Sequence, residues 1–150
     1  MTINAAQPIV VVEDSEDDYE ATERALKRDG VLLNPILHFD NGEDALNYIL
    51  HRPPYDRAAA PPRPELVLLD LNMPGVDGRE VLAAIKGNAE TRSIPVIVLT
   101  TSDDAWDINH CYQAGANSYI KKPVAMDRFF AALGEMKSYW LGLALLPRED

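Results

Sequence analysis

Four or five short apolar stretches rich in Val, Ile and Leu recur along the chain, and each is followed by a segment with helical spacing. Continuous apolar runs are typical of strands buried on both faces, and their alternation with helices is typical of crossover units in a parallel sheet. The pattern therefore predicts an α/β fold. The predicted strands are PIVVV from Pro8, NPILHF from Asn34, ELVLL from Glu65, IPVIVL from Ile94 and NSYIK from Asn117.

Five helices are predicted after these strands. The first begins at Ser15, whose hydroxyl caps the backbone in a box-like pattern with Asp18, and ends near Gly30. The fourth covers about residues 104–114, and the fifth is the longest, from about Met126 toward Leu146. The positions expected to pack inward are Tyr19, Thr22, Ala25 and Leu26 in the first helix, Ala45, Leu46, Ile49 and Leu50 in the second, and Val81, Leu82 and Ile85 in the third.

The segment from His51 to Glu65 contains five prolines, so neither a helix nor a central strand can continue through it. We interpret it as an elongated loop within one domain and not as a linker between two. Further along, Asp77 and Gly78 indicate a turn, and Gly75 and Gly78 allow a positive φ there.

The composition limits the class of partner. The chain has 150 residues, 47% of them hydrophobic, and its 14 basic and 24 acidic side chains give a net charge of −10. This length supports one domain with a substantial core. The negative charge argues against nucleic acid and anionic membrane as partners, since both are polyanions.

Cysteine usage and hydropathy indicate the compartment. Cys111 is the only cysteine, which excludes an intrachain disulfide and a CxxC redox pair. The N-terminus has no basic segment before its apolar run, and no apolar stretch approaches the roughly 20 residues that cross a bilayer. We expect a soluble, cytoplasmic protein without a signal peptide.

Polar side chains follow most of the predicted strands. Ligand sites in open parallel sheets form at the carboxyl ends of the strands, so these side chains should meet at one rim. They are Glu13 and Asp14 after the first strand, Asp70 after the third, Thr100, Thr101 and Ser102 after the fourth, and Lys121, Lys122 and Pro123 after the fifth.

Three carboxylates beside a single lysine repel one another and need a cation or a proton to coexist. Hard oxygen ligands suit Mg²⁺, which takes one or two carboxylates and completes its shell with water and phosphate oxygens. The charge count therefore predicts a divalent metal. Asp70 could then attack a phosphoryl group and form an acyl phosphate, with Lys122 and the Thr100 hydroxyl stabilising the transferring oxygens.

This arrangement resembles the receiver domains of two-component response regulators. The resemblance covers nearly the whole chain and implies a flavodoxin-like, doubly wound (βα)5 three-layer sandwich, with a five-stranded parallel sheet of strand order 2-1-3-4-5. We expect one receiver domain over residues 1–150, with a core at about 7–137, a C-terminal extension at about 138–150, and no output domain. The matching residues are Glu13-Asp14, Asp70 with Asn72, Pro74 and Gly75, Thr100-Thr101, Tyr119, and Lys122-Pro123.

The resemblance implies that Asp70 is the phosphoacceptor. It also implies Mg²⁺, with Mn²⁺ as an alternative, held by Asp14, Asp70 and the backbone carbonyl of Asn72. Glu13 would act through water or by shaping the metal site. Glu13 is also a departure, since an aspartate is commonest at this position in the family.

Phosphoryl-stabilising and switch residues follow from the same resemblance. Thr100, Lys122 and the backbone of Thr101 would contact the phosphoryl group. The Thr100 hydroxyl would be drawn toward it, and Tyr119 would move inward to fill the space, as a population shift between two packings. Residues expected to influence the phosphate lifetime through water access are Met73 and Ser102.

A narrower resemblance points to the single-domain regulators that are paired with bacterial phytochromes. The proline-rich loop carries it, together with GREVLAAIK from Gly78, VIVLTTSDD from Val96 and FFAALGEMKSYWL from Phe129. It implies a light-sensing histidine kinase as the upstream partner.

The C-terminal segment has more apolar residues than one stripe of a terminal helix can bury in a small domain. Either it folds back on its own domain or it forms a homodimer contact, and we favour the dimer because apolar patches of this richness mark interfaces. The residues assigned to this dimer or output surface are Phe129, Phe130, Tyr139, Trp140 and Leu141.

The main hypothesis is a stand-alone response regulator that accepts a phosphoryl group from a sensor histidine kinase and signals through protein contacts, without enzymatic turnover. One alternative is a phosphatase of the haloacid dehalogenase type. Such enzymes need an acid two residues after the nucleophile, where this chain has Asn72, and they need room for a substrate cap. The other alternative is a dimeric adaptor that is never phosphorylated.

The remaining polar and aromatic residues have ordinary structural interpretations. The three histidines are widely spaced and none ends a predicted strand, so we expect no catalytic base among them. Cys111 and Trp106 should pack within the fourth helix, and Asp103-Asp104 should start it.

Overall fold

Strands and helices alternate along the chain. The computed structural model describes residues 7–28, 32–56 and 61–147. The strands are β1 (Ile9–Val12), β2 (Ile36–Phe39), β3 (Leu66–Leu69), β4 (Val96–Thr100) and β5 (Ser118–Lys121). The helices are α1 (Glu16–Lys27), α2 (Gly42–Ile49), α3 (Gly78–Lys86), α4 (Ala105–Gln113) and α5 (Met126–Lys137), followed by the π-helical turn η1 (Ser138–Leu143).

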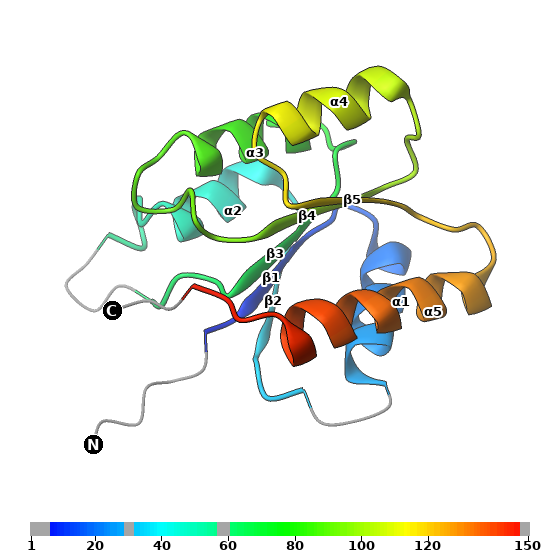
Figure 1. Ribbon diagram of the computed structural model, residues 1–150. Coiled ribbons are helices and arrows are strands. Elements are labelled where there is room, and N and C mark those ends of the chain that lie inside the picture. The colour runs from blue at the N-terminus through cyan, green and yellow to red at the C-terminus, as the bar shows by residue number, and fades with distance from the viewer. Residues whose placement is uncertain (1–6, 29–31, 57–60, 148–150) are drawn as a thin grey trace.

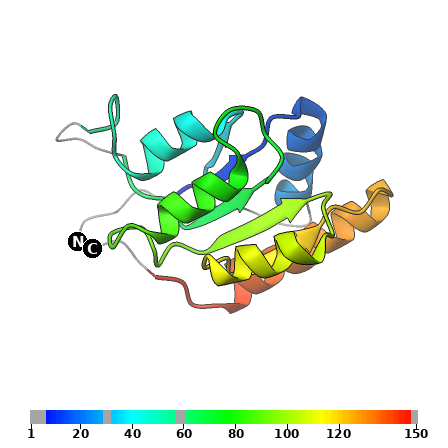
Figure 2. The same ribbon diagram turned by 90° about the horizontal axis from the view of Figure 1, so that it is seen from above.

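The strands form one parallel sheet in the order β2-β1-β3-β4-β5. Helices α2, α3 and α4 cover one face of this sheet, and α1 and α5 cover the other (Figure 1). Seen from above, α2, α3 and α4 follow one another across the sheet (Figure 2). The predicted doubly wound α/β fold and its strand order are therefore confirmed. The order reverses beside β1, where such sheets bind ligands.

The apolar strand residues divide between two core layers. Every residue of β1, β3 and β4 is buried, whereas the edge strands β2 and β5 are only partly buried. Alternate residues point to opposite faces, so Val10 and Val12 pack with α2 and α3, while Ile9 and Val11 pack with α1 and α5. This double burial explains why the strands read as continuous apolar runs.

Side-chain caps start most of the helices. The Ser15 hydroxyl accepts a hydrogen bond from the Asp18 backbone N–H at 3.3 Å, as predicted for α1. Asp77 caps α3 and Asp104 caps α4 in the same way, which confirms that Asp103-Asp104 starts the fourth helix. Helix α1 ends at Lys27, and its predicted end near Gly30 lies outside the described residues.

The two glycines of the turn after β3 act differently. Gly75 has φ +75°, as predicted. Gly78 does not have a positive φ, and this prediction was wrong. Gly78 begins α3 directly against the backbone of Asp70 and Leu71, where a Cβ atom would overlap the Asp70 carbonyl oxygen. The turn needs glycine here because two backbone segments approach closely.

The fifth helix is shorter than predicted. The α-helix ends at Lys137 and widens into η1, in which the Ala144 N–H donates to the Tyr139 carbonyl at 2.7 Å. Trp140 and Leu141 pack against the core from this turn. The backbone is extended at Ala144, so the expectation of a helix toward Leu146 was wrong.

Two further predictions concern the loop and the fourth helix. No helix or strand occurs in the described part of residues 51–65, which agrees with the predicted proline-rich loop. Cys111 is fully buried, as expected, but Trp106 is 63% exposed and stacks on His110. Among the described residues, no helix has both the length and the hydropathy that crossing a membrane requires.

Candidate functional site

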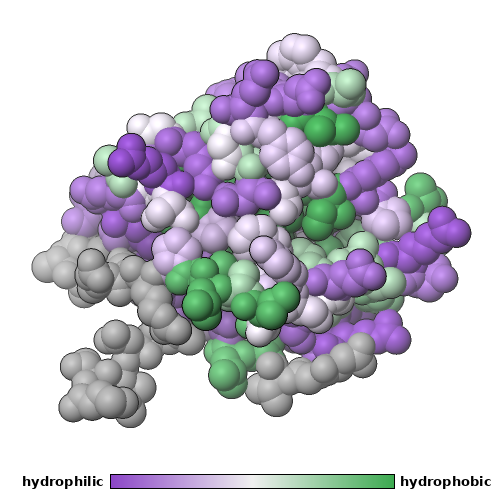
Figure 3. Space-filling view, viewed as in Figure 1, coloured by the Kyte–Doolittle hydropathy of each residue, from purple (hydrophilic) through white to green (hydrophobic). Residues whose placement is uncertain are grey.

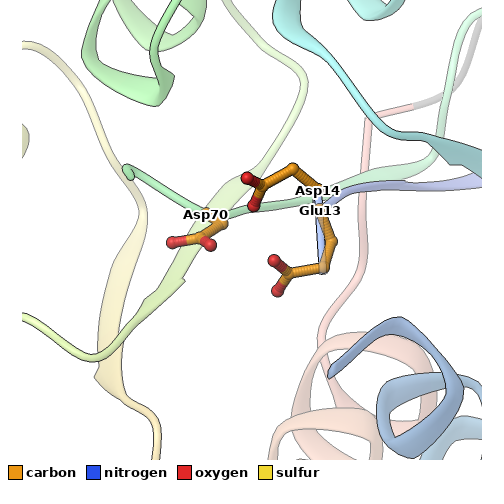
Figure 4. A group of neighbouring side chains, drawn as sticks. All are labelled: Glu13, Asp14 and Asp70. Carbon is orange, nitrogen blue, oxygen red and sulfur yellow. The ribbon is translucent and has the colours of Figure 1, made fainter. Parts of the chain in front are cut away.

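Three acidic side chains meet at the carboxyl ends of β1 and β3. Glu13 and Asp14 follow β1, Asp70 follows β3, and the three lie beside one another (Figure 4). One carboxylate oxygen from each lies within 4.8 Å of the others. Glu13 and Asp70 are buried, whereas Asp14 is exposed. The predicted convergence of the acids is therefore observed.

Strand register places these acids together. Val12 pairs with Leu69, so the next residue on each strand, Glu13 and Asp70, emerges at the same point of the rim. The Asp70 N–H donates to the Val12 carbonyl at 3.0 Å and fixes this register. The Asn72 N–H then donates to a carboxylate oxygen of Asp70 at 3.3 Å, which brings the turn after β3 back over the site.

Lys122 supplies the positive charge predicted for the rim. Its ammonium Nζ lies 2.5 Å from Glu13 Oε1, 2.9 Å from Asp18 Oδ2 and 3.4 Å from Asp70 Oδ2. The side chain is only 6% exposed. Its backbone N–H donates to the Thr100 carbonyl at 2.7 Å, so β4 and β5 hold the lysine in place.

The site has too little positive charge for its carboxylates. Burial raises the pKa of Glu13 to about 8, and the Asp70 carboxylate adds to the rise while Lys122 opposes it. Burial alone would lower the pKa of Lys122, but its hydrogen bonds to Glu13 and Asp18 outweigh burial and raise that pKa. A proton or a second cation is needed to balance this group.

The donor set fits a divalent cation. Carboxylate oxygens from Glu13, Asp14 and Asp70 are hard ligands, and their spacing lets one ion contact more than one of them. The exposed position of Asp14 leaves room for water in the ion's shell. Both the oxygen chemistry and the missing positive charge therefore fit Mg²⁺ or Mn²⁺.

Thr100 and its neighbours lie on the β4 side of the rim. Thr100 is fully buried, and its hydroxyl accepts a hydrogen bond from the Asn72 side-chain amide at 3.3 Å. Thr101 is exposed. Met73 is 6% exposed and packs in the core layer beneath α2 and α3, so its side chain does not lie open to solvent. The Ser102 hydroxyl donates to Asp107 at 2.8 Å.

Tyr119 connects β5 to this loop. Its phenolic O–H donates to the Ser102 backbone carbonyl at 2.8 Å, and its ring packs partly buried against the core. Its backbone N–H donates to the Tyr112 hydroxyl at 3.1 Å. The residue predicted to be the switch is thus tied to the segment that follows Thr100.

Sequence reasoning missed two ionic contacts. Asp18 was interpreted only as part of the α1 cap, yet its carboxylate contacts Lys122. Asp14 precedes the N-cap of α1 and is not part of the helix, so no helical spacing indicated the contact of Asp18 with Lys122. The second missed contact is the ion pair between Arg79 at the start of α3 and the buried Asp107 in α4, at 2.8 Å. Nothing in the spacing of these two residues indicates it.

One histidine lies beside the site. His38 stacks on Tyr19 with ring centroids 3.7 Å apart, and its Nε2 lies 2.7 Å from the Glu13 backbone carbonyl. It contacts the backbone of the site and no carboxylate that the structure describes. This contact fits a supporting residue and not a catalytic base.

A large groove lies away from the acids. It has a volume of about 1,020 Å³ and lies between the C-terminal end of α1, helix α5 and η1. Its lining includes Phe130, Tyr139 and Leu141 and none of the acidic site residues.

The chain is similar to known proteins over most of its length. The family model for the response regulator receiver domain matches residues 9–134. The response regulator Rcp1 of Synechocystis sp. is 35% identical over 144 residues, which are 96% of this chain and 95% of Rcp1. The chain belongs to the response regulator receiver family.

Solved structures agree with this assignment. The phosphorylated cyanobacterial phytochrome response regulator RcpA has a TM-score of 0.87 and 36% identity, covering 96% of this chain and all of RcpA. The Mn²⁺-bound form of Rcp1 has a TM-score of 0.87 and 35% identity, covering 95% of this chain and 99% of Rcp1. This chain is thus a receiver domain related to phytochrome response regulators, and the phosphatase alternative is not favoured.

Proposed function

We propose that Asp70 is the phosphoacceptor of a two-component phosphorelay. The observation that carries the proposal is the position of Asp70 at the strand ends of a receiver fold, with carboxylate oxygens of Glu13 and Asp14 within 4.8 Å and the Lys122 ammonium 3.4 Å away. Asp70 is only 8% exposed. Its carboxyl group nevertheless lies at the rim of the sheet, where a phosphodonor can approach it. A carboxylate in this position can act as a nucleophile.

The transfer forms one bond and breaks one bond. A carboxylate oxygen of Asp70 attacks the phosphorus of a phosphohistidine, so an O–P bond forms as the N–P bond breaks. The leaving imidazole keeps the electron pair of that bond and takes up a proton. Lys122, the Thr100 hydroxyl and the Thr101 backbone N–H are proposed to stabilise the phosphoryl oxygens.

We propose Mg²⁺ as the resident cation, with Mn²⁺ as a substitute. Asp14, Asp70 and the backbone carbonyl of Asn72 would hold it, and Glu13 would act through water or by shaping the site. When bound, the cation supplies charge neutralisation at the phosphoryl oxygens. Two observations support this ligand set. The three carboxylates are closely spaced, and the site has too little positive charge to balance them.

The proposed switch uses Thr100 and Tyr119. A phosphoryl group adds about −1.5 to −2 charge, and the Thr100 hydroxyl would turn toward it and leave Asn72. Tyr119 would then give up its hydrogen bond to the Ser102 carbonyl and move inward. Ser102 and Met73 remain the proposed modulators of phosphate lifetime, with Ser102 the more accessible of the two.

The proposed phosphodonor is a histidine kinase of the phytochrome type, acting in the cytoplasm, where ATP is available. The support is the similarity to RcpA and Rcp1 over nearly the whole chain. Phosphotransfer from a panel of purified kinases tests this partner. Faster transfer from phytochrome kinases than from the others is expected, and equal or slower transfer would contradict the link.

The proposed output is a change in protein contacts, including a homodimer. Hydrophobic side chains lie on the face shown in Figure 3, where the C-terminal segment follows α5. Tyr139 is 51% exposed, and Phe130, Trp140 and Leu141 are partly buried. Phe129 is buried in the core, so the proposed contact uses the other four residues. Sedimentation with and without beryllofluoride tests the dimer, and a monomer under both conditions would contradict it.

The chain is proposed to be modified once per transfer cycle and not to turn over substrates as an enzyme. Incubation with acetyl phosphate and Mg²⁺ should add one phosphoryl group per chain, and chelation of the metal should prevent the addition. An unmodified chain would support the adaptor alternative. Rapid hydrolysis of a generic phosphate ester would support a phosphatase.

A further inference from the structure

Three carboxylates share the Lys122 ammonium, and one of them comes from outside the strand ends. Glu13 and Asp70 follow strands β1 and β3, but Asp18 lies in the first turn of α1. The Asp18 carboxylate lies 2.9 Å from Lys122 Nζ. It does not belong to the group of acids whose oxygens lie within 4.8 Å of one another. Lys122 therefore contacts two members of that group and one separate acid.

The backbone of Asp18 is held firmly. Its N–H donates to the Ser15 hydroxyl at 3.3 Å, and its carbonyl accepts a hydrogen bond from the Thr22 hydroxyl at 2.8 Å. The side chain is 45% exposed, while that of Lys122 is 6% exposed. The Asp18 side chain thus reaches inward from a fixed backbone position to the buried ammonium group of Lys122.

The distances place the Lys122 ammonium closer to Glu13 and Asp18 than to the phosphoacceptor Asp70. Nζ lies 2.5 Å from Glu13 and 2.9 Å from Asp18, but 3.4 Å from Asp70. A cation bound among Glu13, Asp14 and Asp70 would compete with Lys122 for the Glu13 oxygens. The bound cation would not compete with Lys122 for the Asp18 carboxylate. Lys122 can therefore keep its contact with Asp18 when the cation is bound.

We propose that Asp18 is a positioning residue that acts through Lys122. While Asp70 is unmodified, Asp18 holds the ammonium on the α1 side of the rim and adds negative charge that favours a divalent cation. Once Asp70 carries a phosphoryl group, the same carboxylate competes for Lys122 and repels the new oxygens. This inference rests on the proposed function of Asp70 and extends it to a residue of α1.

The proposal predicts opposite effects on two affinities. Replacing Asp18 with Asn removes one of the three negative charges that contact the Lys122 ammonium, and it releases Lys122 toward Asp70. Mg²⁺ affinity should fall about three- to tenfold, and beryllofluoride affinity at saturating Mg²⁺ should rise by a similar factor, as Coulomb's law gives for one charge at this range. A general loss of structure would lower both.

Asp17 offers a matched control. It is the neighbouring exposed acid on the same turn, so Asp17→Asn changes the net charge equally without touching the Lys122 contact. Asp18→Glu keeps the charge and should restore both affinities to within about twofold of the wild type. Thermal unfolding of each variant checks that it is folded.

The experiment is calorimetric titration of each variant with Mg²⁺ alone and then with beryllofluoride at saturating Mg²⁺. We expect Asp18→Asn to shift the two affinities in opposite directions. Neither Asp17→Asn nor Asp18→Glu should show these shifts. Equal affinities for Asp18→Asn and Asp17→Asn, or a joint fall of both affinities, would overturn the role of Asp18. If wild-type protein itself binds no beryllofluoride, the proposed function of Asp70 fails instead.

Discussion

Tyr119 donates its phenolic O–H to the backbone carbonyl of Ser102 at 2.8 Å. This bond joins β5 to the loop that follows β4, and the Ser102 hydroxyl extends the connection to Asp107 in α4 at 2.8 Å. Arg79 in α3 pairs with the same Asp107 carboxylate at 2.8 Å. An inward movement of Tyr119 would therefore break a bond at one end of a chain of contacts that reaches α3.

Replacing Tyr119 with Phe should lower the free energy of unfolding by about 1 kcal/mol, because a partly buried hydrogen bond is lost while the ring stays. Urea unfolding measures the change. Tyr139→Phe is the control, since the Tyr139 side chain is exposed, and it should leave stability within about 0.5 kcal/mol of the wild type. Equal effects from both variants would show that the bond to Ser102 contributes nothing specific.

The Arg79–Asp107 contact should make stability depend on pH. Burial tends to raise the pKa of the Asp107 carboxyl, but hydrogen bonds from Ser102 and Arg79 outweigh burial and hold that pKa below its usual value. The unfolded chain therefore binds the proton more readily. The stabilisation is present above about pH 4, near the ordinary Asp pKa, and is lost as the pH falls through the folded-state pKa.

Urea unfolding of the wild type and Asp107→Asn at a series of pH values tests this dependence. The wild type should be more stable by about 1–3 kcal/mol near neutral pH, as expected for hydrogen bonds to a charged group. The difference should stay constant down to about pH 5 and shrink below about pH 4. If the stability difference between the wild type and Asp107→Asn grew as the pH fell, the lowered pKa of Asp107 would be contradicted.

Gly78→Ala should destabilise the protein strongly, by more than about 3 kcal/mol, because the new Cβ atom would meet the Asp70 carbonyl and the Leu71 backbone. Gly134→Ala in α5 is the matched control, since no atom lies within 4 Å of the added Cβ atom. That change should stabilise the protein by about 0.5–1 kcal/mol, as alanine is the better helix residue. Thermal unfolding compares them, and similar stabilities for both variants would contradict the close approach.

Thr100→Ala should slow phosphorylation by acetyl phosphate about tenfold or more, because it removes the buried hydroxyl that we propose donates to the phosphoryl oxygens. Thr101→Ala keeps its backbone N–H and should react at close to the wild-type rate. Phos-affinity electrophoresis over time gives both rates. If the two variants are slowed equally, the Thr100 hydroxyl has no special role.

Much of the site could be predicted because parallel strands end at a common edge. Glu13, Asp70 and Lys122 each directly follow the end of a strand, so their convergence follows from the α/β pattern alone. Asp18 could not be placed in this way. Its backbone position in a helix cap was predictable, but the reach of its side chain to a lysine 104 residues away depends on how α1 packs.

The fold was less predictable where packing decides the local structure. The strands were predictable from runs of Val, Ile and Leu. The end of α5 was not, because it depends on how Trp140 and Leu141 pack against the core from a π-helical turn. The glycine at position 78 was predictable as a turn residue, whereas the close approach of the Asp70 backbone was not. The ion pair of Arg79 with Asp107 likewise depends on two helices lying side by side.

Chemical mapping of the phosphorylated residue tests the central claim most directly. Wild-type protein treated with acetyl phosphate and Mg²⁺ is reduced with borohydride, which converts an aspartyl phosphate to homoserine, and is then sequenced by mass spectrometry. Homoserine at position 70, and no phosphorylation of Asp70→Asn, is the predicted result. Homoserine at another acid, or equal phosphorylation of Asp70→Asn, would contradict the account.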